Sequence, residues 1–120
     1  MPNDCWNHIT ITADKDELSQ LMANEFSKYE GEEEIFSISQ QGDEAVRLRI
    51  WSAWHPDFEL LKSLLRKYPS CWVKNEWTVE DGQAGVWLGT AREGKEEIRQ
   101  FLWEDMSIEE EVYRFRLGRG

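Results

Sequence analysis

Hydrophobic and polar residues alternate along several short segments of the chain, as they do in strands that are buried on one face of a sheet. The clearest such segment is 46–51, where apolar side chains at the even positions alternate with arginine and tryptophan. The other segments span 8–12, 35–40, 71–80 and 85–90. Because each is only five to ten residues long, the pattern predicts an antiparallel sheet of short strands.

Two segments have apolar residues at helical spacing instead. The first covers about 15–29, and Asp14 and Glu17 form a sequence pattern typical of a capping box at its start. The second lies between Pro56 and Pro69. A proline fits the first turn of a helix, and the residue before a second proline leaves the helical region, so the two prolines are expected to bound this helix.

The predicted order is β-α-β-β-α-β-β, which is typical of an α+β, ferredoxin-like split β-α-β fold with two helices on one face of an antiparallel sheet. A C-terminal α-β extension follows, with a helix over 94–105 and a strand over 112–117. Alternatively, Ser107 caps a second helix there. At 120 residues we expect a single domain over 1–120, with a core over 1–90 and the extension over 91–120.

Charge and composition limit the kinds of partner and the cellular compartment that we expect. The 24 acidic and 14 basic residues give a net charge of −10, which disfavours nucleic-acid binding by the whole surface and favours a basic partner. The first residues lack a secretory signal and no apolar run is long enough to span a membrane. The two cysteines, Cys5 and Cys71, are then expected to be reduced thiols in a cytoplasm.

Four short motifs carry a family resemblance: Cys-x-Asn-x-Ile-Thr-Ile at 5–11, Trp-Ser-Ala-Trp-His-Pro at 51–56, Tyr-Pro at 68–69, and Glu-Asp-Gly-Gln-Ala-Gly at 80–85. In this order and spacing they resemble the YubB-like ferredoxin-fold family of phage- and plasmid-encoded proteins. The resemblance covers about 2–90. It implies the same fold, an origin in a mobile genetic element and the cytoplasm of a bacterial host cell, and it brings no catalytic residues with it.

Candidate chemistry is sparse. Cys5 and His8 have a spacing that suits zinc, but no second close pair accompanies them. Ser52 and His55 are near in sequence, but they have no nucleophile elbow around them. We therefore expect a protein that is not an enzyme, with no catalytic residue, cofactor or metal.

Acidic residues gather at the expected turns and helix ends and are candidates for partner binding. These candidates are Glu30, Glu32, Glu33, Glu34, Asp43, Glu44, Glu109, Glu110 and Glu111. Arranged along one edge, they would imitate the phosphates of a nucleic acid. With the mobile-element setting, this predicts protein–protein contact with a basic or nucleic-acid-handling partner, as in an anti-CRISPR or anti-restriction inhibitor of the host.

The alternative function is a nucleic-acid-binding module on the sheet face that the helices leave open. If Leu48 and Leu88 face the helices, that open face carries aromatic and basic side chains, as in sheets that stack RNA bases. The candidates there are Arg47, Arg49, Trp51, Trp72 and Trp87. The C-terminal extension or a second subunit could instead cover this face, and the sequence leaves the oligomeric state open.

Overall fold

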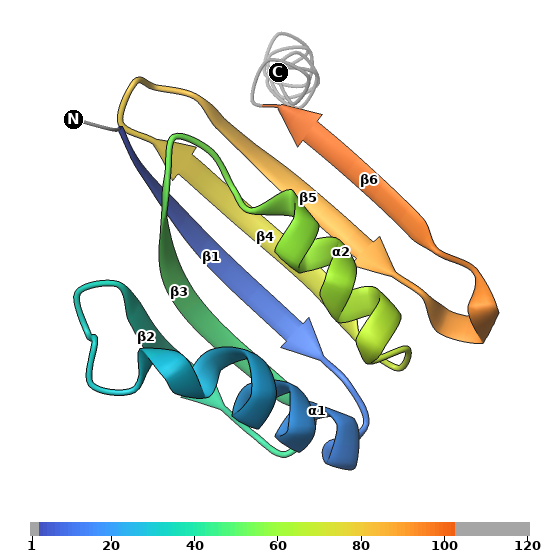
Figure 1. Cartoon of the computed structure of the whole chain (residues 1–120). Helices are drawn as coiled ribbons and strands as arrows, with labels where there is room; N and C mark the ends of the chain where they lie inside the picture. Colours follow the sequence, from blue (N-terminus) through green and yellow to red (C-terminus); the bar gives the residue numbers. More distant parts are fainter. Residues whose placement is uncertain (1–2, 103–120) are drawn as a thin grey trace, which may run out of the picture.

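The computed structural model describes residues 3–102, which form an α+β fold with a six-stranded antiparallel sheet and two helices on one of its faces (Figure 1). The strands are β1 (Asp4–Thr12), β2 (Phe36–Gln41), β3 (Ala45–Ala53), β4 (Trp72–Val79), β5 (Ala84–Thr90) and β6 (Glu97–Leu102). The helices are α1 (Lys15–Leu21) and α2 (Phe58–Lys67). A π-helical turn (Met22–Phe26) and a 3-10 turn (Ser27–Tyr29) extend α1, so helical structure covers the predicted 15–29.

The strand order is β2-β3-β1-β4-β5-β6, and every neighbouring pair is antiparallel. This arrangement is consistent with the predicted ferredoxin-like fold. β1 lies at the centre, with β3 on one side and β4 on the other. Alternate residues of these three strands therefore form one continuous row on each face of the sheet.

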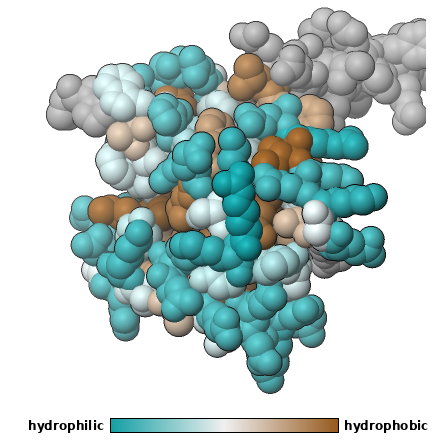
Figure 2. Space-filling model, turned by 45° about the vertical axis from the view of Figure 1, so that its right-hand side comes forward, coloured by the Kyte–Doolittle hydropathy of each residue, from teal (hydrophilic) through white to brown (hydrophobic). Residues whose placement is uncertain are grey.

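The core lies between the sheet and the helices. On the sheet side it contains apolar residues of the three central strands, among them Ile9, Leu48 and Val73. The helices add Leu18, Leu21, Phe26, Leu61, Leu64 and Leu65, all less than 4% exposed. The outer surface of the helix-bearing side is mostly hydrophilic and shows only scattered hydrophobic patches (Figure 2).

Helix starts differ from the sequence prediction. The Asp14 side chain makes no capping hydrogen bond, and Glu17 Oε1 instead accepts from the backbone N–H and the hydroxyl of Ser70, both at 3.0 Å. The predicted capping box is therefore wrong, because a distant turn supplies two donors to the same carboxylate. α2 begins two residues after Pro56, with Asp57 Oδ1 accepting from Leu60 N at 3.0 Å as the cap.

β5 faces the opposite way from the sequence prediction. Trp87 is 0% exposed and lies on the helix side, whereas Val86 and Leu88 are half-buried on the other face. The reason is space. A Cβ on Gly89 would lie 2.5 Å from the Trp87 ring, and one on Gly85 would lie 2.6 Å from the Trp77 ring. Two glycines on the inner face thus make room for two large indoles.

The segment 97–102 is the strand β6, so the predicted helix over 94–105 is wrong for these residues. Glu93 and Gly94 have positive φ angles of 59° and 74° and reverse the chain direction. β6 then pairs along β5, with Phe101 opposite Val86. In this segment, strand pairing with the open edge of β5 outweighs the weak helical spacing of its apolar residues. The rest of the predicted extension, 103–120, lies outside the described residues.

In residues 3–102, no helix combines the length and the apolar character that crossing a membrane requires.

Candidate functional site

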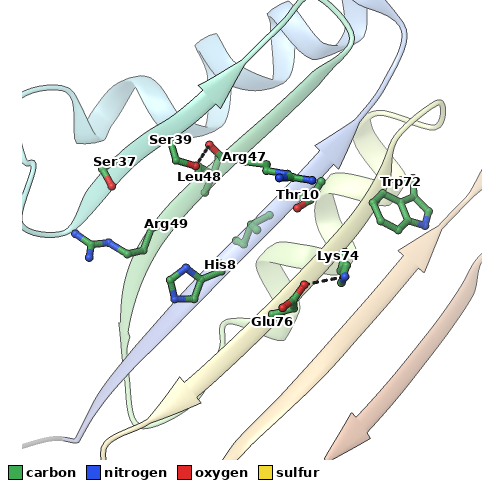
Figure 3. Close-up of a pocket in the computed structure, with 11 residues that line it drawn as sticks. His8, Thr10, Ser37, Ser39, Arg47, Leu48, Arg49, Trp72, Lys74 and Glu76 are labelled. Carbon is green, nitrogen blue, oxygen red and sulfur yellow. Dashed lines mark hydrogen bonds and ion pairs between the residues drawn. The ribbon is translucent and has the colours of Figure 1, made fainter. Parts of the chain in front are cut away.

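The face of the sheet opposite the helices forms a shallow depression of about 790 Å³ over β2, β3, β1 and β4 (Figure 3). Alternation along each strand places its lining. β1 contributes His8 and Thr10, β3 contributes Arg47 and Arg49, and β4 contributes Trp72, Lys74 and Glu76. Ser37 and Ser39 of β2 form the rim. We call this surface the open face.

Positive charge exceeds negative charge in this depression. Arg47, Arg49 and Lys74 contribute three cations, and Glu76 contributes one anion. Lys74 Nζ lies 2.7 Å from Glu76 Oε1, whereas neither arginine has an ion pair within residues 3–102. A chain with a net charge of −10 thus keeps a small cationic area at the middle of its sheet.

Indole rings lie beside these cations. The Arg49 guanidinium carbon is 4.6 Å from the centroid of the Trp6 ring, which is a cation–π contact. Trp51 donates its indole N–H to Asp4 Oδ1 at 2.7 Å, which fixes this ring next to Trp6 across the strand pair. Trp72 lies at the other end of the depression and is half-buried. The open face therefore combines flat apolar rings with cations.

A carboxyl pair lies at the end of the sheet where β1 begins and β4 ends. The backbone N–H of Asp4 donates to Glu80 Oε1 at 3.2 Å, and Glu80 N donates to Asp4 O at 3.0 Å. The side-chain hydrogen bond between the two carboxyls, helped by the Trp51 indole, lowers the pKa of Asp4. The same bond to Asp4 raises the pKa of Glu80, and the nearby negative charge of Asp4 raises it further.

The acidic candidates separate into two groups. Glu30, Glu32, Glu33 and Glu34 are exposed in the turn that precedes β2, and Asp43 and Glu44 are exposed in the hairpin that follows it. The groups therefore flank β2 at opposite ends and do not form one continuous row. Glu109, Glu110 and Glu111 lie outside the described residues.

Four of the five sheet-face candidates, Arg47, Arg49, Trp51 and Trp72, lie on the open face as predicted. Trp87 does not, because the glycines beside it turn the ring into the core. Sequence reasoning missed Trp6, which shares its face with His8 and Thr10. Extending the same alternation two residues toward the start of the chain would have found it.

The structure does not bring together the side chains of the candidate zinc site or of the candidate nucleophile–base pair. Cys5 is buried on the helix side of β1, whereas His8 is exposed on the open face. The Ser52 hydroxyl donates to the backbone oxygen of His55 at 2.8 Å, while the His55 ring contacts Pro56 O. Among residues 3–102, no three His, Cys, Asp or Glu side chains come close enough to hold a metal ion.

Comparisons of the chain with family models, with curated proteins and with solved structures found no match.

Proposed function

We propose that this protein binds single-stranded nucleic acid on the open face of its sheet. The observation that carries this proposal is a pair of arginines that form no ion pair within residues 3–102 and lie beside indole rings on a surface that neither helix covers. We also interpret β1 to β4 with both helices as a ferredoxin-like core, which β5 and β6 extend at one edge. The proposed function is binding and involves no reaction.

The chemistry of the open face matches the two parts of a nucleotide. Arg47 supplies charge-assisted donors for phosphate oxygens, and the indole of Trp72 supplies an apolar surface on which a base can stack. The hydroxyl of Ser37 adds a donor at the rim. Arginine and tryptophan together are the groups that sheet-based RNA-binding domains use.

A single strand fits better than a duplex. A duplex carries one negative charge per about 1.7 Å and presents its base edges only inside grooves. The acidic turns around the sheet would repel its long phosphate backbones, while the small cationic area could neutralise only a few phosphates. A single strand exposes its bases for stacking and brings fewer charges.

Fluorescence anisotropy with labelled twelve-nucleotide oligo(U) and oligo(dT) at low salt tests this proposal. Arg47→Glu should weaken binding about tenfold or more, since it reverses a charge that meets phosphate. Arg66→Glu is the matched control, because Arg66 is 64% exposed on α2, on the other side of the sheet. If the parent protein binds neither oligonucleotide, the proposal is wrong.

A second candidate function is favoured by the turn before β2. Its four glutamates are exposed, and within residues 3–102 none has an ion pair. Together with the YubB-like resemblance, this supports contact with a basic, nucleic-acid-handling host protein, as expected of a counter-defence protein.

The test is salt-dependent binding to purified CRISPR and restriction nucleases. The variant Glu32→Lys/Glu33→Lys changes the turn before β2, and Asp43→Lys/Glu44→Lys in the hairpin after β2 is the control. Binding that survives high salt, or that both variants retain, would count against it.

A further inference from the structure

The open face has aromatic rings at two places that lie far apart along β1. Trp6 belongs to β1 itself, and Trp72 of β4 lies opposite Thr12, six residues further along β1. Six residues of a strand span about 20 Å. The two indoles therefore mark the two ends of one track along the middle of the sheet.

The cations lie between these two ends. Arg49 is opposite His8, and Thr10 has Arg47 on one side and Lys74 on the other. Figure 3 shows the same sequence of groups across the face, with His8 between Arg49 and Glu76, and Arg47 beside Thr10. Along β1 the track therefore begins with an aromatic ring at residue 6, has one cation beside residue 8 and two beside residue 10, and ends with a second ring beside residue 12.

The first ring carries a cation on its face. The Arg49 guanidinium lies 4.6 Å from the Trp6 centroid, and the Arg49 Nε is buried and has no hydrogen-bond partner among residues 3–102. This packing holds the planar guanidinium in place. Bases stack on guanidinium planes as well as on indoles, so the Trp6–Arg49 pair is one stacking platform and Trp72 is the other.

We infer that the open face binds one single strand along β1, with a base stacked on each of the two platforms and the phosphates between them held by Arg47 and Lys74. This rests on the proposed function and adds a footprint to it. A stacked strand advances about 3.4 Å per nucleotide, so about seven nucleotides reach from one platform to the other. A strand with splayed bases needs fewer, and the range of four to seven lies within the site sizes of other single-strand binders, about 4–16.

The test is a length series of oligo(U) and oligo(dT) with three, six, nine and twelve nucleotides. Affinity should rise steeply up to the length that spans both platforms and change little beyond it. Trp72→Ala should lower the affinity for the nine-nucleotide strand about tenfold, and Trp72→Phe should retain most of it, because phenylalanine still stacks. Trp54→Ala is the control, since Trp54 is 56% exposed but lies outside the depression.

The outcomes separate the two proposals. If no length binds, the proposed function fails and the footprint fails with it. If all lengths bind equally well per molecule, or Trp72→Ala binds the nine-nucleotide strand as tightly as the parent, the two-platform track is wrong while nucleic-acid binding stands. A far-ultraviolet spectrum and a thermal melt of each variant establish that the loss of affinity is not a loss of folding.

Discussion

The carboxyl groups of Asp4 and Glu80 interact where β1 begins and β4 ends. The pKa of Asp4 is lowered and that of Glu80 is raised, mainly through the hydrogen bond between them. The raised pKa of Glu80 stabilises the fold at low pH, and this contribution is lost as pH rises through that value. The lowered pKa of Asp4 stabilises the fold at higher pH, and this contribution is lost as pH falls through it.

We therefore expect Glu80→Gln to change the pH dependence of stability. Above the raised pKa of Glu80 both carboxylates are charged and repel each other, so the neutral amide should raise the thermal midpoint at pH 7 relative to the parent. Between the two pKa values Glu80 is protonated, which removes the repulsion, and the difference should shrink. Melts from pH 3.5 to 7.5 measure this, and a difference that does not vary with pH would contradict the raised pKa of Glu80.

The two cysteines should be inert in the folded protein. Both side chains are 0% exposed, and burial raises the pKa of Cys5 and raises that of Cys71 to about 11. A thiol reagent at pH 8 attacks the thiolate, which is scarce and inaccessible here. We expect labelling of the native protein to be at least about a hundredfold slower than in denaturant. Rapid labelling of either thiol without denaturant would show that its burial is wrong.

Among the elements, β5 depends most on residues that have no side chain. Gly89→Ala would place a Cβ 2.5 Å from Trp87 and 2.8 Å from Leu65. Such overpacking of a core costs about 1–3 kcal/mol, which urea denaturation would detect. Gly42→Ala is the matched control, because the nearest atom to its Cβ is at 3.7 Å. Equal stability of the two variants would mean that Trp87 can move aside.

The alternation of residues predicted β1, β3 and β4 well, because each has branched or sulfur-containing apolar side chains on one face only. The same rule failed in β5, where both faces carry apolar residues and the inner one alternates glycine with tryptophan. No local pattern tells which of two apolar faces meets a helix. β6 was missed for another reason, since its strand pairing depends on an edge that only the folded sheet provides.

Part of the candidate site could be predicted for the same reason. Arg47, Arg49, Trp51 and Trp72 follow from alternation in strands whose inner face is unambiguous. The contact between Arg49 and Trp6 could not, because it joins two strands whose register depends on the whole sheet. The separation of the acidic turns by β2, in contrast, already follows from the predicted strand over 35–40.

For the whole molecule, charge determines how strongly binding depends on salt. If Arg47 and Lys74 each neutralise one phosphate, the logarithm of the affinity should fall with the logarithm of salt concentration at a slope of about −1.4. Arg47→Gln should reduce this slope by about 0.7. Titrations between about 50 and 200 mM salt measure both slopes. A slope near zero in the parent protein would mean that the cations do not meet phosphate.

The central position of β1 limits when its strand pairs can form during synthesis on the ribosome. Cys5 of β1 pairs with Val79 of β4, so more than half of the chain has to be synthesised after β1 before this second neighbouring strand exists. At about 5–20 residues per second, a ribosome needs roughly four to fifteen seconds to add that stretch. During this time the apolar side of β1, with Ile9 and Ile11, can be covered only by segments made soon after it, and α1 brings Leu18 and Leu21 within a few residues. The first helix is therefore the earliest segment of the chain that can cover the apolar side of β1.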